Sequence, residues 1–339
     1  MKILTVQEQK SLEQFFQLNQ TTLLKAMVQY LKKHYEKVIA SEKYVIAVGD
    51  IPVGLVAHLD TVFHSTPEDI YYDRMKNVMW SPDGLGADDR AGVYAIAQIV
   101  KGGLKPTVIL TTDEEIGGIG ASALVKAYPN CPVDLKYIIE LDRRGSLDCV
   151  FYDCGNSKFE DYIESFGFVT NWGTFSDISI ICPKWKIAGV NLSIGYYDEH
   201  STSEILRIGQ MFNTIKLVQK MLLDAETADH FEYIKAKYLS FSNEYYEWDP
   251  TYGVSREDWD RWFNPSYSLD VECDKCKTAD NQYNLVPVLF PDKSTKYYCV
   301  DCLAKSSHIR WCSKCGEPYF DKRELKEEIC YSCREVVND

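Results

Sequence analysis

The sequence has no long apolar stretch and no excess of basic residues. No segment approaches the ~18 consecutive apolar residues of a membrane-spanning helix, although 45% of the 339 residues are hydrophobic. The formal net charge is −13, which argues against a general binder of nucleic acid or of anionic membranes. The N-terminus also lacks the apolar core of a secretory signal. We therefore expect a soluble, cytoplasmic protein.

Cysteine is sparse before residue 270 and concentrated after it. The four early cysteines are scattered, and we interpret them as small buried apolar side chains: Cys131, Cys149, Cys154 and Cys182. The other eight form four C-x-x-C pairs between positions 273 and 333. In a chain without a secretory signal, such pairs favour metal binding over disulfides.

The spacing of these pairs predicts two structural zinc sites. The first two pairs are separated by 22 residues and the last two by 14, which is typical of zinc ribbons. Four thiolates form a closed tetrahedral site without an open position. We predict sequential pairing of the C-x-x-C units, and an interleaved cross-brace stays open. The predicted ligands are Cys273, Cys276, Cys299, Cys302, Cys312, Cys315, Cys330 and Cys333.

The formal charge of this zinc-ribbon module limits its possible binding partners. Residues 271–339 carry 11 Lys and Arg against 12 Asp and Glu, a formal charge of −1 before thiolates and metal are counted. Ribbons that bind nucleic acid are usually more basic. Docking of a protein partner, gating of substrate and stabilisation stay open as its role.

The remainder of the chain alternates short apolar runs with helical patterns, which predicts an α/β domain with a mixed sheet and helices on both faces. We expect a long amphipathic helix over 8–38, a hairpin turn at 49–52 and a helix over 204–222. The predicted organisation is a catalytic domain at 1–225, an acidic, aromatic-rich connector at 226–270 and the double zinc ribbon at 271–339.

Acidic and histidine side chains follow several of the predicted strands or begin predicted helices. Sites in open α/β sheets gather at the carboxyl ends of strands, and imidazole and carboxylate are good zinc ligands. Each group alone has an ordinary explanation as a surface pair or a helix cap, but together they predict a metal cluster. They are His58, Asp60, Asp88, Asp89, Asp113, Glu114, Glu115, Asp142 and His200.

Over about residues 40–222 the sequence resembles the co-catalytic di-zinc exopeptidases and amidohydrolases, which include zinc aminopeptidases and peptidase T-like tripeptidases. The stretch GTFSDISII at 173–181 is similar to the aminopeptidase branches. The resemblance lies in motifs that follow one another in a fixed order: His58-Leu59-Asp60-Thr61-Val62, Gly86-Ala87-Asp88-Asp89-Arg90-Ala91-Gly92, Glu114-Glu115, Asp142 and His200.

The resemblance implies a zinc exopeptidase-like fold and a role for each matched residue. Asp88 would bridge two zinc ions, with cobalt or manganese as substitutes, and the peptide bond that follows it would be cis. His58 and Asp142 would complete one metal site, and Glu115 and His200 the other. Asp60 would orient His58, and Glu114 would be the general base for water activated between the ions. Asp113 receives no role.

The chain departs from lid-containing relatives because only 58 positions separate Asp142 from His200. We therefore expect no lid or dimerisation insertion, which favours an aminopeptidase acting on peptide substrates over a carboxypeptidase. Arg143 and Arg144 can bind a carboxylate or lie solvated on the surface. Two alternatives stay open: an N-acyl amino-acid amidohydrolase with the same centre, and a zinc-ribbon adaptor with a degenerate peptidase domain.

Overall fold

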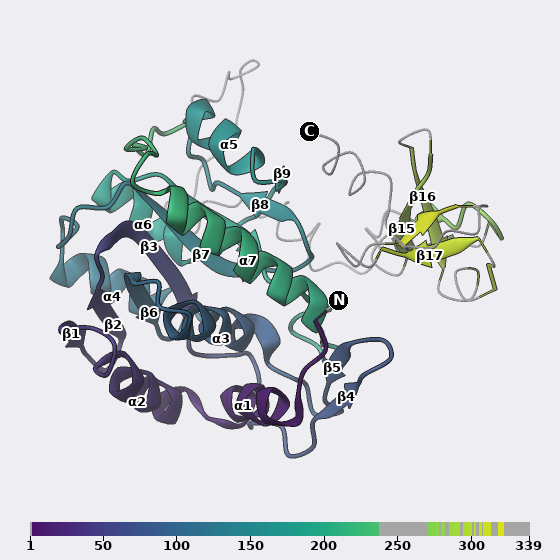
Figure 1. The fold of residues 1–339 in the computed structure, drawn as a ribbon, viewed down its shortest axis with the longest axis horizontal. Helices are drawn as coiled ribbons and strands as arrows, with labels where there is room; N and C mark the ends of the chain where they lie inside the picture. Colours follow the sequence, from purple (N-terminus) through teal and green to yellow (C-terminus); the bar gives the residue numbers. More distant parts are fainter. Residues whose placement is uncertain are drawn as a thin grey trace, which may run out of the picture. The chain divides into compact units, whose positions relative to one another are not determined.

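The computed structural model describes residues 2–236 and, with gaps, residues 270–321. The chain divides into two compact units, and the first of these spans Lys2–Lys237 (Figure 1). Among the residues described in the two units, no helix combines the length and the apolar character needed to cross a membrane.

The first unit is built on an eight-stranded mixed sheet. Strand β3 lies parallel to both β6 and β7, and β7 lies parallel to β10, whereas β2 and β8 are antiparallel to their inner neighbours. The predicted mixed sheet is therefore confirmed. In spatial order the strands are β1 (Lys37–Ala40), β2 (Tyr44–Val48), β6 (Pro106–Thr111), β3 (Ile51–His58), β7 (Tyr137–Arg143), β10 (Gly189–Ser193), β8 (Asp148–Val150) and β9 (Val169–Thr170).

Helices cover both faces of this sheet, as predicted. Successive residues of a strand point to opposite faces, so Leu55 and Ala57 of β3 join one apolar cluster and Val56 joins the other. The larger cluster packs under α1 (Val6–Gln17), α2 (Gln20–Leu31), α3 (Ala87–Lys101), α5 (Ser157–Glu164) and α7 (Ile208–Asp224). The smaller packs under α4 (Ile119–Ala127) and α6 (Asp177–Trp185). Figure 1 shows α3 and α7 side by side.

A second, four-stranded sheet belongs to the same unit. Its strands are all antiparallel and lie in the order β11 (Tyr196–Tyr197), β12 (Ile205–Arg207), β5 (Val78–Trp80) and β4 (Tyr71–Asp73). His200 lies in the connection between β11 and β12. The small sheet therefore holds both ends of the segment that carries this histidine.

Two of the predicted helices were wrong in extent. The helix expected over 8–38 is two helices, because Asn19 leaves the helical conformation and its side chain accepts a hydrogen bond from the Thr22 amide, which starts α2 anew. The helix expected over 204–222 begins at Ile208, because residues 205–207 pair with β5 and β11 instead.

The hairpin predicted at residues 49–52 was also wrong. Strands β2 and β3 do not pair with each other, because β6 lies between them. The amides of Asp50 and Ile51 donate to the carbonyl oxygen of Lys105, just before β6. The chain does reverse its direction between β2 and β3, but both strands pair with β6 and not with each other.

The segment between Asp142 and His200 contains no lid domain. It forms β8, α5, β9, α6, β10 and β11, of which β8, β9 and β10 belong to the central sheet. The expectation of a compact fold without a lid or dimerisation insertion is confirmed for this part of the chain, all of which the structure describes.

The second unit contains short strands in the described part of residues 270–321. Strands β13 (Asp270–Glu272) and β14 (Ala279–Asn281) form an antiparallel pair. A four-stranded sheet has the order β16 (Thr295–Cys299), β15 (Leu285–Leu289), β18 (Pro318–Phe320) and β17 (Ile309–Trp311).

Residues beyond α7 pack on the first unit. The side chain of Phe231 is only 6% exposed and lies among three aromatic rings, with centroid distances of 5.0 Å to Phe159, 5.2 Å to Tyr162 and 6.0 Å to Tyr137. Its backbone amide donates to the carbonyl oxygen of Lys136. Chain beyond residue 225 therefore contributes to the core of the α/β unit, whereas residues 237–269 of the predicted connector lie outside the described residues.

We expect Phe231→Ala to lower the free energy of unfolding by about 3–5 kcal/mol, because it leaves a cavity among the three rings. Urea denaturation followed by the helical circular dichroism signal measures this, since α1 to α7 all lie in the first unit. Leu223→Ala is the matched control, because Leu223 is 72% exposed and its truncation should change stability by less than about 0.5 kcal/mol. Equal effects of the two substitutions would contradict the packing role of Phe231.

Candidate metal centre

Three parallel neighbouring strands deliver most of the predicted site residues to one edge of the sheet. His58 is the last residue of β3, Glu114 and Glu115 follow β6, and Asp142 is the penultimate residue of β7. Because the three strands run in the same direction, their carboxyl ends meet at this edge. The structure therefore brings these side chains together at the ends of the strands.

The beginning of α3 brings Asp88 to the same place. Asp88 and Asp89 do not have helical backbone angles, and the peptide bond between them is cis, as predicted. Gly92 allows α3 to approach β7 closely, because a Cβ atom there would lie 2.2 Å from the carbonyl oxygen of Leu141. Asp88 therefore lies beside the end of the strand that carries Asp142.

Asp88 lies between the two histidines. Its Oδ1 is 3.1 Å from Nε2 of His58, and its Oδ2 is 3.2 Å from Nε2 of His200. Asp142 Oδ1 lies 3.4 Å from the same His58 nitrogen, and Glu115 Oε2 lies 3.0 Å from that of His200. The side chains thus form two groups of three that share Asp88, and the ligand atoms of each group lie within 4.8 Å of one another.

Asp60 connects three parts of the centre. Its Oδ1 lies 3.3 Å from Nδ1 of His58 and also accepts a hydrogen bond from the Glu114 amide. Its Oδ2 accepts from the Glu115 amide at 3.1 Å. Asp60 therefore fixes the backbone of the two glutamates relative to the imidazole of His58.

Glu204 supports Asp88 in a corresponding way, although no role was predicted for it from the sequence. Its two carboxylate oxygens accept hydrogen bonds of 3.0 Å from the amides of Ala87 and Asp88. The side chain is fully buried. Glu204 begins the segment from β12 to α7, so it connects the chain after His200 to the backbone of Asp88. In the sequence, only its position four residues after His200 connects Glu204 with the site.

The pKa values reflect the crowding of charges. Burial alone would lower the pKa of His58, but the carboxylates of Asp142, Asp60 and Asp88 raise it well above its usual value. Hydrogen bonds to Asp88 and Glu115 raise the pKa of His200 to about 11. Burial raises the pKa of Glu114 well above its ordinary value. The centre therefore attracts positive charge strongly.

A second layer of polar groups lies beneath Asp142, on the sheet face covered by α6. The Oγ of Ser176 donates to Glu140, and the Thr111 hydroxyl donates to Asp177. Asn191 donates to the Asp142 carbonyl oxygen at 2.7 Å. Ser176 and Asp177 fall in the stretch 173–181 noted in the sequence, whereas Glu140 lies within strand β7.

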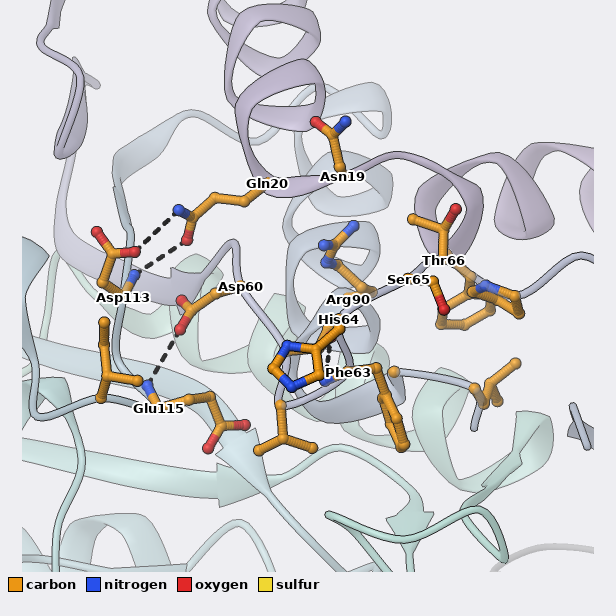
Figure 2. Close-up of a pocket in the computed structure, with 17 residues that line it drawn as sticks. Asn19, Gln20, Asp60, Phe63, His64, Ser65, Thr66, Arg90, Asp113 and Glu115 are labelled. Atoms are coloured by element: carbon orange, nitrogen blue, oxygen red, sulfur yellow. Dashed lines mark hydrogen bonds between the residues drawn. The ribbon is translucent and has the colours of Figure 1, made fainter. Parts of the chain in front are cut away.

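Asp113, for which the sequence suggested no role, is held by three side chains. It accepts hydrogen bonds from Gln20 Nε2 at 3.0 Å, from Lys43 Nζ at 2.6 Å and from the hydroxyl of Thr112. Its own amide donates to the Gln20 side chain (Figure 2). Asp113 therefore ties α2 and the turn before β2 to the backbone that carries Glu114 and Glu115.

Two cavities adjoin the centre, and Glu115 lines both. The larger, of about 550 Å³, lies beneath the junction of α1 and α2 and includes Asn19, His64 and Arg90 (Figure 2). The Arg90 guanidinium donates to the carbonyl oxygens of Phe15 and Leu18, which fixes that junction. The smaller cavity, of about 170 Å³, contains the clustered acids together with Arg143 and Arg144.

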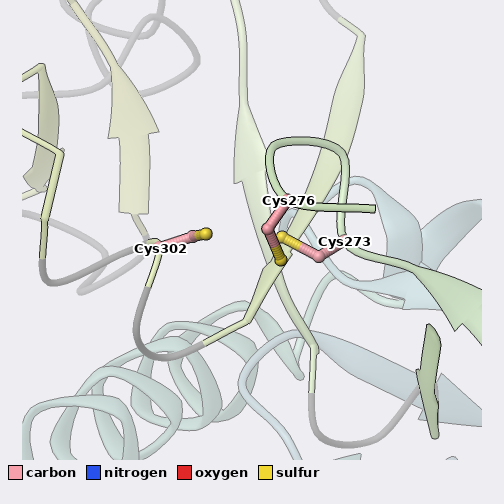
Figure 3. A group of neighbouring side chains, drawn as sticks. All are labelled: Cys273, Cys276 and Cys302. Atoms are coloured by element: carbon pink, nitrogen blue, oxygen red, sulfur yellow. The ribbon is translucent and has the colours of Figure 1, made fainter. Parts of the chain in front are cut away.

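Three of the predicted zinc-ribbon cysteines lie together in the second unit. The sulfur atoms of Cys273, Cys276 and Cys302 are within 4.8 Å of one another and point toward a common centre (Figure 3). Cys299 is the last residue of β16, and Cys312 is buried. This grouping accords with sequential pairing of the first two C-x-x-C units. Cys315, Cys330 and Cys333 lie outside the described residues.

Comparison with known proteins reveals similarity in structure but not in sequence. No family model matches the chain, and a comparison with curated proteins finds no match. A tripeptidase from Staphylococcus aureus superposes with a TM-score of 0.53 at 13% identity, over 67% of this chain and 100% of its own. The aminopeptidase PepT from Bacillus cereus superposes with a TM-score of 0.50 at 14% identity, over 64% of this chain and 97% of its own. At these identities the likeness establishes a shared fold.

We expect Glu204→Gln to weaken divalent-metal binding at the Asp88 centre by about 10–100-fold. Both oxygens of Glu204 accept hydrogen bonds from backbone amides, and in glutamine one of them is replaced by an NH₂ group that cannot accept. Competition with a chelating indicator measures the affinity. Glu42→Gln is the matched control, because Glu42 is exposed in the turn between β1 and β2. An affinity for metal that is the same in both variants would show that Glu204 does not position Asp88.

Proposed function

We propose that this protein is a metal-dependent exopeptidase that hydrolyses peptide bonds as an aminopeptidase. The observation that carries the proposal is the position of Asp88, whose two oxygens face different histidines while Asp142 and Glu115 complete two groups of ligands. Such an arrangement suits a pair of metal ions bridged by one carboxylate. The fold shared with a tripeptidase and an aminopeptidase supports the same reaction class.

The chemistry of the donor atoms fits divalent metal. Several acids are gathered in a small volume, and Oε1 of Glu115 is buried without a hydrogen-bond partner among the described residues. An unpaired carboxylate oxygen in such a position is destabilising unless a cation neutralises it. Imidazole nitrogen and carboxylate oxygen are ligands that zinc accepts. We assign His58, Asp88 and Asp142 to one metal, and Asp88, Glu115 and His200 to the other.

Bound metal ions would polarise the scissile carbonyl and lower the pKa of the attacking water. Glu114 would take the proton from that water on a carboxylate oxygen and deliver it to the nitrogen of the leaving amine. Its side chain is buried, which raises its pKa and favours retention of the proton between these two steps. Asp60 would hold the Glu114 backbone and the His58 ring in place during the reaction.

We further propose that the second unit binds structural zinc through its cysteines. Cys273, Cys276 and Cys302 would supply three thiolates of a first site. The spacing of the C-x-x-C pairs in the sequence makes Cys299 its fourth ligand. The remaining cysteines would form a second site. The two kinds of centre share no ligands, because the proposed catalytic ligands all lie in the first unit.

We expect hydrolysis of peptides with a free N-terminal amine, loss of this activity on chelation and recovery on addition of zinc, cobalt or manganese. A panel of free-amine peptides and their N-acylated counterparts measures the substrate class, with metal content followed by elemental analysis. Faster hydrolysis of the acylated peptides would assign an amidohydrolase instead. Full activity with no detectable metal would refute the proposal.

We expect Glu114→Gln to keep the fold and both metal ions but to reduce turnover by about 10²–10⁴-fold, because it removes the proton acceptor and no proposed ligand. Glu115→Gln is the matched comparison, since it should lose one metal ion. Elemental analysis and kcat values of the two variants measure this difference. The reverse pattern of metal loss would mean that the two glutamates have exchanged roles.

A further inference from the structure

The smaller cavity combines acidic and basic side chains. Its acids include the proposed metal ligands Asp88, Glu115 and Asp142. Its basic residues are His200, also a proposed ligand, and two arginines, Arg143 at the end of β7 and Arg144 directly after it. An exopeptidase needs carboxylates to hold metal, but the two guanidinium groups have no part in the chemistry proposed above. Their presence in this cavity therefore requires a separate explanation.

The two arginines differ in their partners. Arg144 Nη1 lies 2.9 Å from Oε1 of Glu199, with which it forms an ion pair. Arg143 donates from Nη2 to the main-chain oxygen of Trp172 at 3.1 Å and forms no ion pair with a carboxylate among the described residues. Its Nε is buried and has no hydrogen-bond partner there. Arg143 thus contributes a cation with unused donors to the wall of the cavity.

The chemistry of guanidinium identifies the ligand that would satisfy these donors. Its planar N–H groups match a carboxylate and can bind it through two parallel hydrogen bonds. The cavity has a volume of about 170 Å³, below the ~300 Å³ at which pockets for drug-sized ligands begin. It therefore has room for one amino-acid residue, so the carboxylate must belong to a residue next to the scissile bond.

We propose that Arg143 binds a carboxylate of the substrate, on a residue adjacent to the bond that is cleaved. This inference rests on the proposed exopeptidase function and specifies its substrate class. The carboxylate is either the C-terminal group of a dipeptide or the side chain of an acidic residue. In both cases the enzyme selects substrates by charge in this cavity, without the arginine of a lid domain.

The test compares hydrolysis of matched peptides by wild-type protein and by Arg143→Gln. Alanyl-alanine and its C-terminal amide report on the terminal carboxylate, whereas alanyl-glutamate amide and alanyl-glutamine amide report on the side chain. We expect wild-type protein to prefer the charged member of one pair in kcat/KM. Arg143→Gln should reduce that preference by about 10–100-fold, the worth of a charge-assisted hydrogen bond.

Two further variants make the result specific. Arg143→Lys should retain part of the preference, because it keeps the charge but not the planar donors. Arg74→Gln is the matched control for removal of a guanidinium, since Arg74 donates to the carbonyl oxygen of Leu4 and lines neither cavity. A preference unchanged in Arg143→Gln, or one reduced equally in Arg74→Gln, would overturn the inference.

A binding measurement separates this inference from the proposed function. Calorimetry with the non-hydrolysable aminomethylene isostere of alanyl-alanine, as acid and as amide, reports on Arg143 whether or not any peptide is cleaved. Tighter binding of the acid to wild-type protein, lost in folded Arg143→Gln, would support the inference. Equal binding of the two forms would refute the terminal carboxylate as ligand. Hydrolysis of no peptide, together with selective binding of the acid, would refute the proposed function alone.

Discussion

The structure depends on the accommodation of several carboxylates at one edge of a sheet. Two like charges 4 Å apart repel by about 4 kcal/mol at an effective dielectric constant of 20, and here five acids lie near the ends of β3, β6 and β7. Histidines offset part of this repulsion, because His58 lies within 3.4 Å of three carboxylates and His200 lies within 3.2 Å of two. The acids concerned are Asp60, Asp88, Glu114, Glu115 and Asp142.

Hydrogen bonds from backbone N–H groups offset much of the remaining repulsion between the carboxylates, and they determine the geometry of the centre. Asp60 accepts from the amides of two consecutive glutamates, Glu204 from two residues at the start of α3, and Asp89 from the amides of His58 and Gly92. Each of these acids therefore fixes a stretch of main chain that carries a proposed ligand. The outer acids Asp60, Asp89 and Glu204 thus position the main chain of the proposed ligands that lie inside them.

The parts that could be predicted from the sequence are those governed by local pattern. Apolar runs that end in His58 or Asp142 revealed the strand ends, and parallel pairing then brought the acids together. The hairpin prediction failed because strand order is a non-local property, and β6 lies between β2 and β3. The sequence predicts no role for Glu204 or Asp113, because their partners are distant along the chain. Glu204 accepts from the backbone of Asp88, and Asp113 from the side chain of Gln20, and no spacing rule connects these positions.

Glu140 is a buried acid beneath the centre whose surroundings disfavour a negative charge. Burial, together with Asp142 and Asp177, raises the pKa of Glu140 well above its usual value, which favours the protonated form of this side chain. A protonated carboxyl costs far less to bury than an anion, and Ser176 and Asn191 complete a polar network around it. If Glu140 were ionised, its charge would lie two residues from Asp142 on the same strand and would oppose the ionisation of that proposed ligand. This network supports Asp142 through hydrogen bonds, and protonation of Glu140 limits the repulsion that the proposed ligand has to withstand.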